Sequence, residues 1–159
     1  QYGACREKTW TYSDDGIKFK VEPSKTAYQE GDNLLKEIRL VHSNIPHEIK
    51  TIKQILAQNI PIIFGINIFP SFEYEEVEKT GIIEMPSKLE RPIGAHALTL
   101  VGYNDITKQF KFANSWGATW GDNGFGYLPY DYVLNKNSEN DILHTYPREL
   151  WSIALSKAI

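Results

Sequence analysis

The chain has 159 residues, of which 42% are hydrophobic and 23% charged, and its formal net charge is −3. These values suit one globular domain, or one and part of another, and they argue against wholesale disorder. No cluster of Lys and Arg stands out, no apolar run is long enough to span a bilayer, and residues 1–20 lack the pattern of a signal peptide. Neither a nucleic-acid nor a membrane partner is therefore expected.

Cysteine usage points to a reducing environment. The chain has one cysteine, Cys5, and no Asn-x-Ser/Thr sequon, so an internal disulfide is impossible. An intracellular location is favoured on that ground. The chain opens on Gln1, and Gly3 stands where helices commonly end. We therefore expect the first residues to continue a helix from a preceding segment.

The first third of the chain predicts few regular elements. Residues 6–33 are polar and rich in turn residues, which indicates a surface crossing segment with little regular structure. Residues 34–41 fit a helix or a strand, and their β-branched end favours a strand. Residues 43–59 predict the clearest helix, with Ser43 or Asn44 as its N-cap. Its apolar stripe consists of Ile45, Ile49, Ile52, Ile55 and Leu56.

The rest of the chain is predicted to be mainly β-structure. Residues 60–69 are almost wholly apolar and too short for another full helix, so they predict a buried strand. Residues 70–94 contain three prolines and two glycines, which predicts a long irregular connection, with the Glu-rich run inside it as a solvated face. Phe110 and Phe112 share one face of a later strand. The strands expected in this part span 95–103, 109–116, 124–128 and 151–155, with a turn at 104–105 and a polar loop at 135–140.

Two side chains in the β-rich part have the pattern of a catalytic pair. His96 heads one predicted strand, and Asn114 follows 18 positions later, near the end of its hairpin partner. An Asn carbonyl oxygen can accept a hydrogen bond from one imidazole nitrogen and leave the other nitrogen facing a thiol, whose pKa a neighbouring imidazolium lowers. We expect a hydrogen bond between the two side chains. The indoles of Trp116 and Trp120 should pack over it and exclude water.

The segments around this pair resemble the papain family of cysteine peptidases. They read GAHALTLVGY at 94–103 and NSWGATWG at 114–121. Further matching segments lie at 2–5, 9–12, 52–57, 61–65, 71–72, 81–82, 124–132 and 150–153. The likeness is to the second half of the family fold, in its disulfide-poor branch.

The resemblance implies a fold class and a division of the chain. The fold is α+β: an antiparallel, barrel-like β domain with one main packed helix, and the helical first domain is largely missing. Residues 1–33 would then be a crossing segment from that domain, and residues 34–159 the β-rich C-terminal domain. Taken alone, such a domain should leave an apolar face uncovered beside His96, Trp116 and Trp120.

The resemblance also implies peptide-bond hydrolysis through an acyl-enzyme. His96 would be the general base and then the acid, Asn114 would orient it, a peptide or protein would be the substrate, and no cofactor would be needed. Ala95 replaces the glycine common before the histidine, which points to an altered substrate pocket rather than to lost catalysis.

The nucleophile is expected outside this chain. In the family it lies roughly 130–150 residues before the histidine. Cys5 lies 91 positions before His96, has none of the expected neighbours, and matches a non-catalytic cysteine of the disulfide-poor branch. A missing helical half, or a second chain, would carry the nucleophile. The chain alone is then expected to be inactive, with Cys5 well away from His96.

Other readings of the sequence stay open or are weaker. A non-catalytic papain-like module that binds a peptide or protein is the alternative to an enzyme. His42 and His47 have no acidic or cysteine partner at metal-ligand spacing, so no zinc site is predicted. Residues 135–141 lack the glycine and the terminal glutamate of a calcium loop.

Overall fold

A computed structural model describes residues 4–13, 15–17, 20–134 and 149–157, of which 35–43 and 153–157 are described by their backbone alone. Two compact units result: Gln1–Val41 with Ala154–Ile159, and His42–Ile153. The boundary predicted between residues 33 and 34 stays a prediction. The expected helix end at Gly3 and the expected polar loop at 135–140 lie outside the described residues.

The first unit contains a helix, α1 (Lys25–Glu37), so the prediction of little regular structure is wrong for the last part of residues 6–33. The overlooked signal is Ser24. Its hydroxyl accepts a hydrogen bond from the backbone N–H of Ala27 at 3.2 Å, as an N-cap does. Ala27 and Gly31 are buried one turn apart, which gives the helix a narrow packed stripe.

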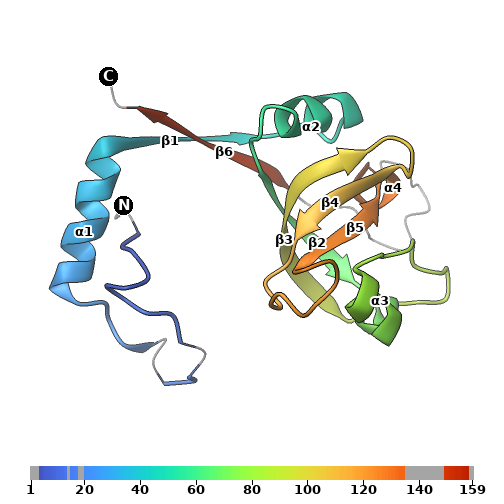
Figure 1. Ribbon diagram of the computed structural model, residues 1–159, viewed down its shortest axis with the longest axis horizontal. Helices are drawn as coiled ribbons and strands as arrows, with labels where there is room; N and C mark the ends of the chain where they lie inside the picture. The colour runs from blue at the N-terminus through green and yellow to red at the C-terminus, as the bar shows by residue number, and fades with distance from the viewer. Residues whose placement is uncertain (1–3, 14, 18–19, 135–148, 158–159) are drawn as a thin grey trace. The chain divides into compact units, whose positions relative to one another are not determined.

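The second unit is built on an antiparallel sheet, which confirms the predicted fold class. The strand order of the sheet is β1-β6-β2-β3-β4-β5. The residues of β1 and β6 are divided between the two units, whereas β2 to β5 belong to the second unit and lie side by side in Figure 1. The strands are β1 (Ile38–Asn44), β2 (Ile62–Ile68), β3 (Gly94–Asn104), β4 (Gln109–Ala113), β5 (Phe125–Pro129) and β6 (Leu150–Lys157). The registers of β2 with β3 and β6, of β3 with β4, and of β4 with β5 are all antiparallel. Each strand lies within a few residues of its predicted position.

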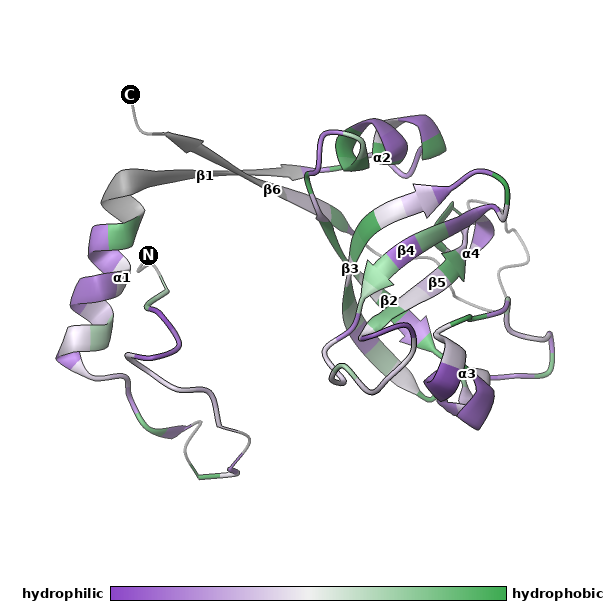
Figure 2. Ribbon diagram, in the orientation of Figure 1, coloured by the Kyte–Doolittle hydropathy of each residue, from purple (hydrophilic) through white to green (hydrophobic). Residues whose placement is uncertain are grey.

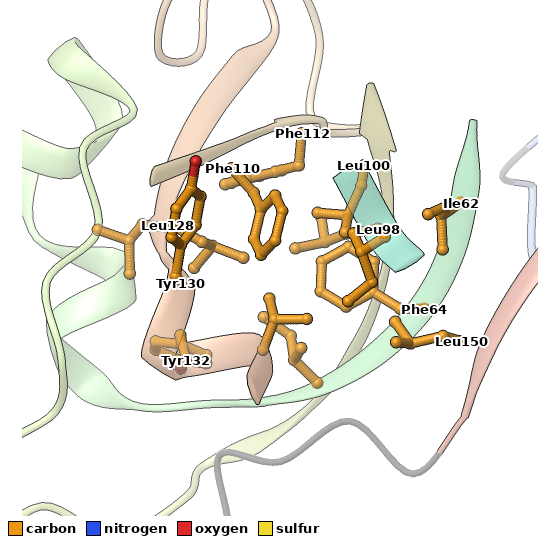
Figure 3. Close-up of a cluster of buried hydrophobic side chains, with 14 of the residues drawn as sticks. Ile62, Phe64, Leu98, Leu100, Phe110, Phe112, Leu128, Tyr130, Tyr132 and Leu150 are labelled. Atoms are coloured by element: carbon orange, nitrogen blue, oxygen red, sulfur yellow. The ribbon is translucent and has the colours of Figure 1, made fainter. Parts of the chain in front are cut away.

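The core fills the space that these strands and α4 (Tyr130–Leu134) enclose, as Figure 3 shows. Phe110 and Phe112 are both fully buried, which confirms their shared face. The prediction of a buried strand holds for only one face of β2. Because strand side chains alternate between faces, Phe64 points into the core whereas Ile63 is 40% exposed. The core contains Ile62, Phe64, Leu98, Leu100, Phe110, Phe112, Leu128, Tyr130, Tyr132 and Leu150.

The helix predicted over 43–59 is real but shorter. It is α2 (Ile49–Leu56), and its N-cap residue is Glu48, not Ser43 or Asn44. Pairing with the sheet explains the difference, since the backbone N–H of Ile45 donates to the carbonyl of Leu150 at 2.8 Å. Ile52 and Leu56 of the predicted stripe are buried, whereas Ile49 is 38% exposed.

The connection over residues 70–94 is less irregular than predicted. It contains the short helices η2 (Pro70–Glu73) and α3 (Glu75–Thr80). The acidic side chains of α3 are exposed, and Figure 2 shows this helix as largely hydrophilic. Gly81 ends α3 in the left-handed conformation, and a Cβ there would collide with the backbone of Phe125. Among the described residues, none of the helices has the length and apolar content that a bilayer-spanning segment requires.

Candidate active site

A β-hairpin brings His96 and Asn114 together. His96 is the third residue of β3, and Asn114 follows the last residue of β4. The register pairs Thr99 with Ala113, so the chain beyond Ala113 runs back along β3 towards His96. The backbone N–H of Asn114 donates to the carbonyl of Gly124 at 2.9 Å, which anchors the residue as it leaves the strand.

The two side chains make the hydrogen bond that the sequence predicted. His96 Nε2 lies 2.9 Å from Asn114 Oδ1. The same oxygen accepts the backbone N–H of Ser115 at 2.8 Å. Because that N–H can only donate, the atom facing it must be the amide oxygen. His96 Nε2 must therefore carry the proton and donate it, which leaves Nδ1 as the unprotonated nitrogen of the neutral ring.

An indole covers the pair on one side. The Trp116 ring stacks on the His96 ring with centroids 5.1 Å apart and planes 27° apart. Trp116 is 40% exposed, whereas Trp120 is only 5% exposed and belongs to the core. Of the two indoles only Trp116 presents substantial apolar surface, and the expected uncovered apolar face beside His96, Trp116 and Trp120 stays a prediction.

Phe72 forms the floor under the indoles. Its ring centroid lies 5.7 Å from that of Trp116, edge to face, and 6.3 Å from that of Trp120, stacked. Phe72 comes from η2, far from both tryptophans in sequence. Sequence reasoning missed this role because an aromatic residue in a connection rich in proline has no periodicity that marks it as core.

Glu90 secures the turn that carries Phe72. Its carboxylate accepts the backbone N–H of Ser71 at 3.0 Å and that of Ser87 at 2.7 Å. Hydrogen bonding from the Ser71 side chain, and then from the backbone of Ser87, lowers the pKa of Glu90 below its ordinary value. A charged carboxylate at neutral pH thus joins the two sides of the loop beneath the site.

One buried polar atom of the site finds no hydrogen-bond partner within the part of the chain that the structure describes. Asn114 Nδ2 is buried, and among the described residues it makes no hydrogen bond. An unpaired buried donor costs about 1–3 kcal/mol. The two bonds at Oδ1 hold the amide in the orientation that carries this cost, because a flipped amide would oppose donors to donors.

The single cysteine and His96 belong to different compact units. Cys5 lies in the first unit, where its half-buried free thiol lines a cavity of about 440 Å³ with Trp10, Tyr12 and Tyr28. Its separation from His96 stays a prediction. In the part of the chain that the structure describes, no three His, Cys, Asp or Glu side chains gather as metal ligands would.

A groove of about 550 Å³ flanks His96 on the other face of the sheet. Ala95 and Ala97, the chain neighbours of His96, form one wall of it. Sequence reasoning expected an altered pocket at Ala95 but not this groove, because its opposite wall comes from β2 and from the start of β6. The lining residues include Ile63, Gly65, Asn67, Ala95, Ala97, Glu149 and Trp151.

Sequence comparisons place relatives of this chain among cysteine proteinases. An uncharacterised peptidase C1-like protein of Acanthamoeba polyphaga mimivirus is 40% identical over 147 residues, which are 89% of this chain and 46% of that protein. Cysteine proteinase 3 of Entamoeba histolytica is 35% identical over 83 residues, which are 50% of this chain and 26% of that protein. The chain thus spans less than half the length of these relatives.

A solved structure gives the same answer for the fold. Xylellain, a cysteine protease from Xylella fastidiosa, superimposes with a TM-score of 0.81 at 28% identity, over 100% of this chain and 58% of xylellain. The sequence profile of the papain family cysteine proteases matches residues 1–143. The profile match, the mimivirus relative and the shared fold together show that this chain belongs to the papain family of cysteine proteases.

Proposed function

We propose that this chain supplies the general base of a cysteine peptidase and that a cysteine outside these 159 residues supplies the nucleophile. The observation that carries the proposal is the hydrogen bond between His96 Nε2 and Asn114 Oδ1. It leaves His96 Nδ1 free to accept a proton. His96 is also only half-buried, so a thiol from another segment has access to it.

The chemistry follows from the free nitrogen. His96 Nδ1 takes the thiol proton, and the thiolate attacks the peptide carbonyl carbon. The imidazolium then returns that proton to the departing amine, which leaves a thioester. A water molecule next gives its proton to Nδ1 and attacks the thioester, which releases the acid and the thiol. Throughout the cycle Asn114 Oδ1 accepts from Nε2 and holds the ring plane, while Trp116 shields the bond from water.

The position of the only cysteine supports a nucleophile elsewhere. Cys5 is the single cysteine of the chain and lies only 91 positions before His96, whereas the nucleophile of the family lies roughly 130–150 residues before the histidine. The chain also spans 46% of its mimivirus relative. We infer that the rest of a peptidase, whether upstream in the same polypeptide or in a second chain, carries the thiol.

Reconstitution tests this proposal. The 159-residue chain is assayed alone and together with the cysteine-bearing part that its own gene encodes upstream or, failing that, the part of the mimivirus relative that this chain does not match. A fluorogenic peptide reports turnover, and a peptidyl vinyl sulfone reports a reactive thiol. We expect turnover only in the combination, with labelling at a cysteine of the added part. His96→Ala should abolish both, whereas His47→Ala should abolish neither.

Two outcomes would overturn the proposal. Turnover by the chain alone that Cys5→Ser removes would make Cys5 the nucleophile. A combination that forms a stable complex yet neither cleaves peptides nor reacts with the vinyl sulfone would favour the alternative, a papain-like module that only binds its peptide or protein.

A further inference from the structure

The turn that carries Phe72 depends on a carboxylate from another part of the chain. Phe72 lies in η2, a four-residue 3-10 helix that begins at Pro70. The first N–H groups of a helix have no partner inside it, and a proline has no N–H at all. The N–H of Ser71 is satisfied from outside η2, because it donates to Oε1 of Glu90 at 3.0 Å. A residue 19 positions after Ser71 therefore helps to set the place of Phe72.

Glu90 is held in turn by two reciprocal bonds with Ser87. Its second carboxylate oxygen, Oε2, accepts the backbone N–H of Ser87 at 2.7 Å. The backbone N–H of Glu90 donates to the carbonyl of Ser87 at 3.1 Å. The two residues thus have the S-x-x-E spacing of a capping box and its bond from the glutamate back to the serine N–H, here in a turn. This turn fixes the direction from which Oε1 reaches Ser71.

The Phe72 ring connects this anchored turn to the catalytic pair. Phe72 is 1% exposed, and its ring lies 6.5 Å from that of Phe112 and 6.3 Å from that of Trp120, both in the core. Its third ring neighbour is Trp116, at 5.7 Å and edge to face. The Trp116 indole stacks on His96 and is 40% exposed. Because protein interiors are close-packed, a shift of Phe72 has to move the indole above it.

We propose that Glu90 is a positioning residue for the peptidase reaction and keeps the indole of Trp116 stacked on His96. It acts through the backbone of Ser71 and the ring of Phe72. When the indole is in place, it keeps water away from the hydrogen bond that orients the imidazole, and a hydrogen bond is stronger in such a low-dielectric setting. Without the carboxylate, the turn relaxes, the indole tilts and water competes for that bond. The inference rests on the proposed function.

Nuclear magnetic resonance of the 159-residue chain tests the stacking directly. The ring current of a stacked indole displaces the resonances of the carbon-bound ring protons of His96. His96→Ala assigns these resonances, and Trp116→Ala gives their positions without the indole. Glu90→Ala should move them towards the Trp116→Ala positions. Glu90→Gln should move them less, because its amide oxygen can still accept one N–H group whereas its NH₂ group cannot accept the other. Glu84→Gln, at an exposed acid of the same connection, should leave them in place.

The reconstituted enzyme provides a second readout, because the orientation of the base affects the chemical step rather than substrate binding. Glu90→Ala should lower kcat with KM nearly unchanged. The loss should be roughly tenfold, since a misplacement of about 1 Å can cost about a hundredfold. Glu90→Gln should give an intermediate kcat, and Glu84→Gln should change neither constant.

Two results would overturn the inference. One is a set of His96 resonances that stays in place in Glu90→Ala, or in Glu90→Gln where the alanine variant does not fold. Lower stability with unmoved resonances would mean that Glu90 is structural only. The other is a loss of activity that appears in KM alone. The resonances are measured without turnover, so they decide the role of Glu90 in the stacking even where reconstitution fails and the proposed function with it.

Discussion

The two ends of the β3–β4 hairpin differ in how completely their polar side chains are paired. At the turn end, Lys53 Nζ lies 2.6 Å from both carboxylate oxygens of Asp105, and the hydroxyl of Tyr130 donates to the same carboxylate at 2.9 Å. Lys53 also sits 4.9 Å from the ring centroid of Tyr103. At the other end, near Asn114, a buried amide donor has no partner among the described residues.

The two ends of the hairpin differ in what they contribute to the stability of this unit. At the turn end, hydrogen bonds from Lys53 and then from Tyr130 lower the pKa of Asp105, and burial, together with the Asp105 carboxylate, raises the pKa of Tyr130. Lys53 and Asp105 are paired there, so that end contributes to stability. The His96 end has a buried donor that no described residue satisfies and an exposed indole, and an unsatisfied buried donor lowers stability.

The largest expected effect is a difference in the free energy of unfolding between substitutions at Trp120, which lies in the core beneath the site, and at Trp116, which covers His96. Trp120→Ala should lower the free energy of unfolding by about 3–5 kcal/mol, because it leaves a cavity in the core beside Phe72 and Phe112. Trp116→Ala should cost only about 1–2 kcal/mol, since that indole is 40% exposed. Urea unfolding of both variants measures the difference. Equal losses of stability would contradict the assignment of Trp120 to the core and of Trp116 to the exposed surface over His96.

The next prediction applies the same substitution at both ends of the hairpin. Asn114→Ala removes the His96 bond but also the unpaired donor, so the free energy of unfolding should change by less than about 0.5 kcal/mol. Asn104→Ala should cost about 1 kcal/mol, because the side-chain oxygen Oδ1 of Asn104 accepts hydrogen bonds from the backbone N–H groups of Ile106 and Thr107 in the turn. A larger loss for Asn114→Ala would show that the comparison is wrong.

The same two variants should also differ in the tautomer of the His96 imidazole ring. Long-range proton–nitrogen correlation spectra of the unsubstituted chain should show the Nε2-protonated tautomer for the neutral His96 ring, because Asn114 Oδ1 can only accept. His96→Ala assigns the signal among the four histidines. Asn114→Ala should produce a mixture of tautomers, and Asn104→Ala should leave the signal unchanged. A predominantly Nδ1-protonated ring in the unsubstituted chain would contradict the orientation described for the pair.

The smallest expected effect concerns acid stability at the turn end. The folded state lowers the pKa of Asp105, so its contribution is present above the unfolded value of about 4 and is lost as the pH falls through the folded value. Asp105→Asn should therefore lower stability at pH 7 and lose less between pH 5 and pH 2 than the unsubstituted chain does. Thermal melts across that range measure the difference. Parallel curves would indicate that the Lys53 pair does not contribute.

The elements that could be predicted are those with a local signal. Strand alternation marked Phe110 and Phe112, and the motif order identified His96 and Asn114 before any coordinates. The helix over residues 25–37 escapes prediction because its cap, Ser24, follows Pro23 in a stretch that is rich in turn residues. The helix predicted over 43–59 was too long because pairing of Ile45 with Leu150, over a hundred residues away, cannot be seen in a local window.

The sequence by itself determined the residue types of the site, their order and the family to which the chain belongs. Only the tertiary structure decided which nitrogen of His96 carries the proton, that Phe72 supports the indoles, and that Gly65 and Glu149 meet beside Ala97. The physical reason is the distance along the chain between the residues that interact. Periodicity and motifs report contacts between residues that are near in the chain, whereas a tautomer, an aromatic floor and a groove depend on side chains that strand pairing brings together from distant segments.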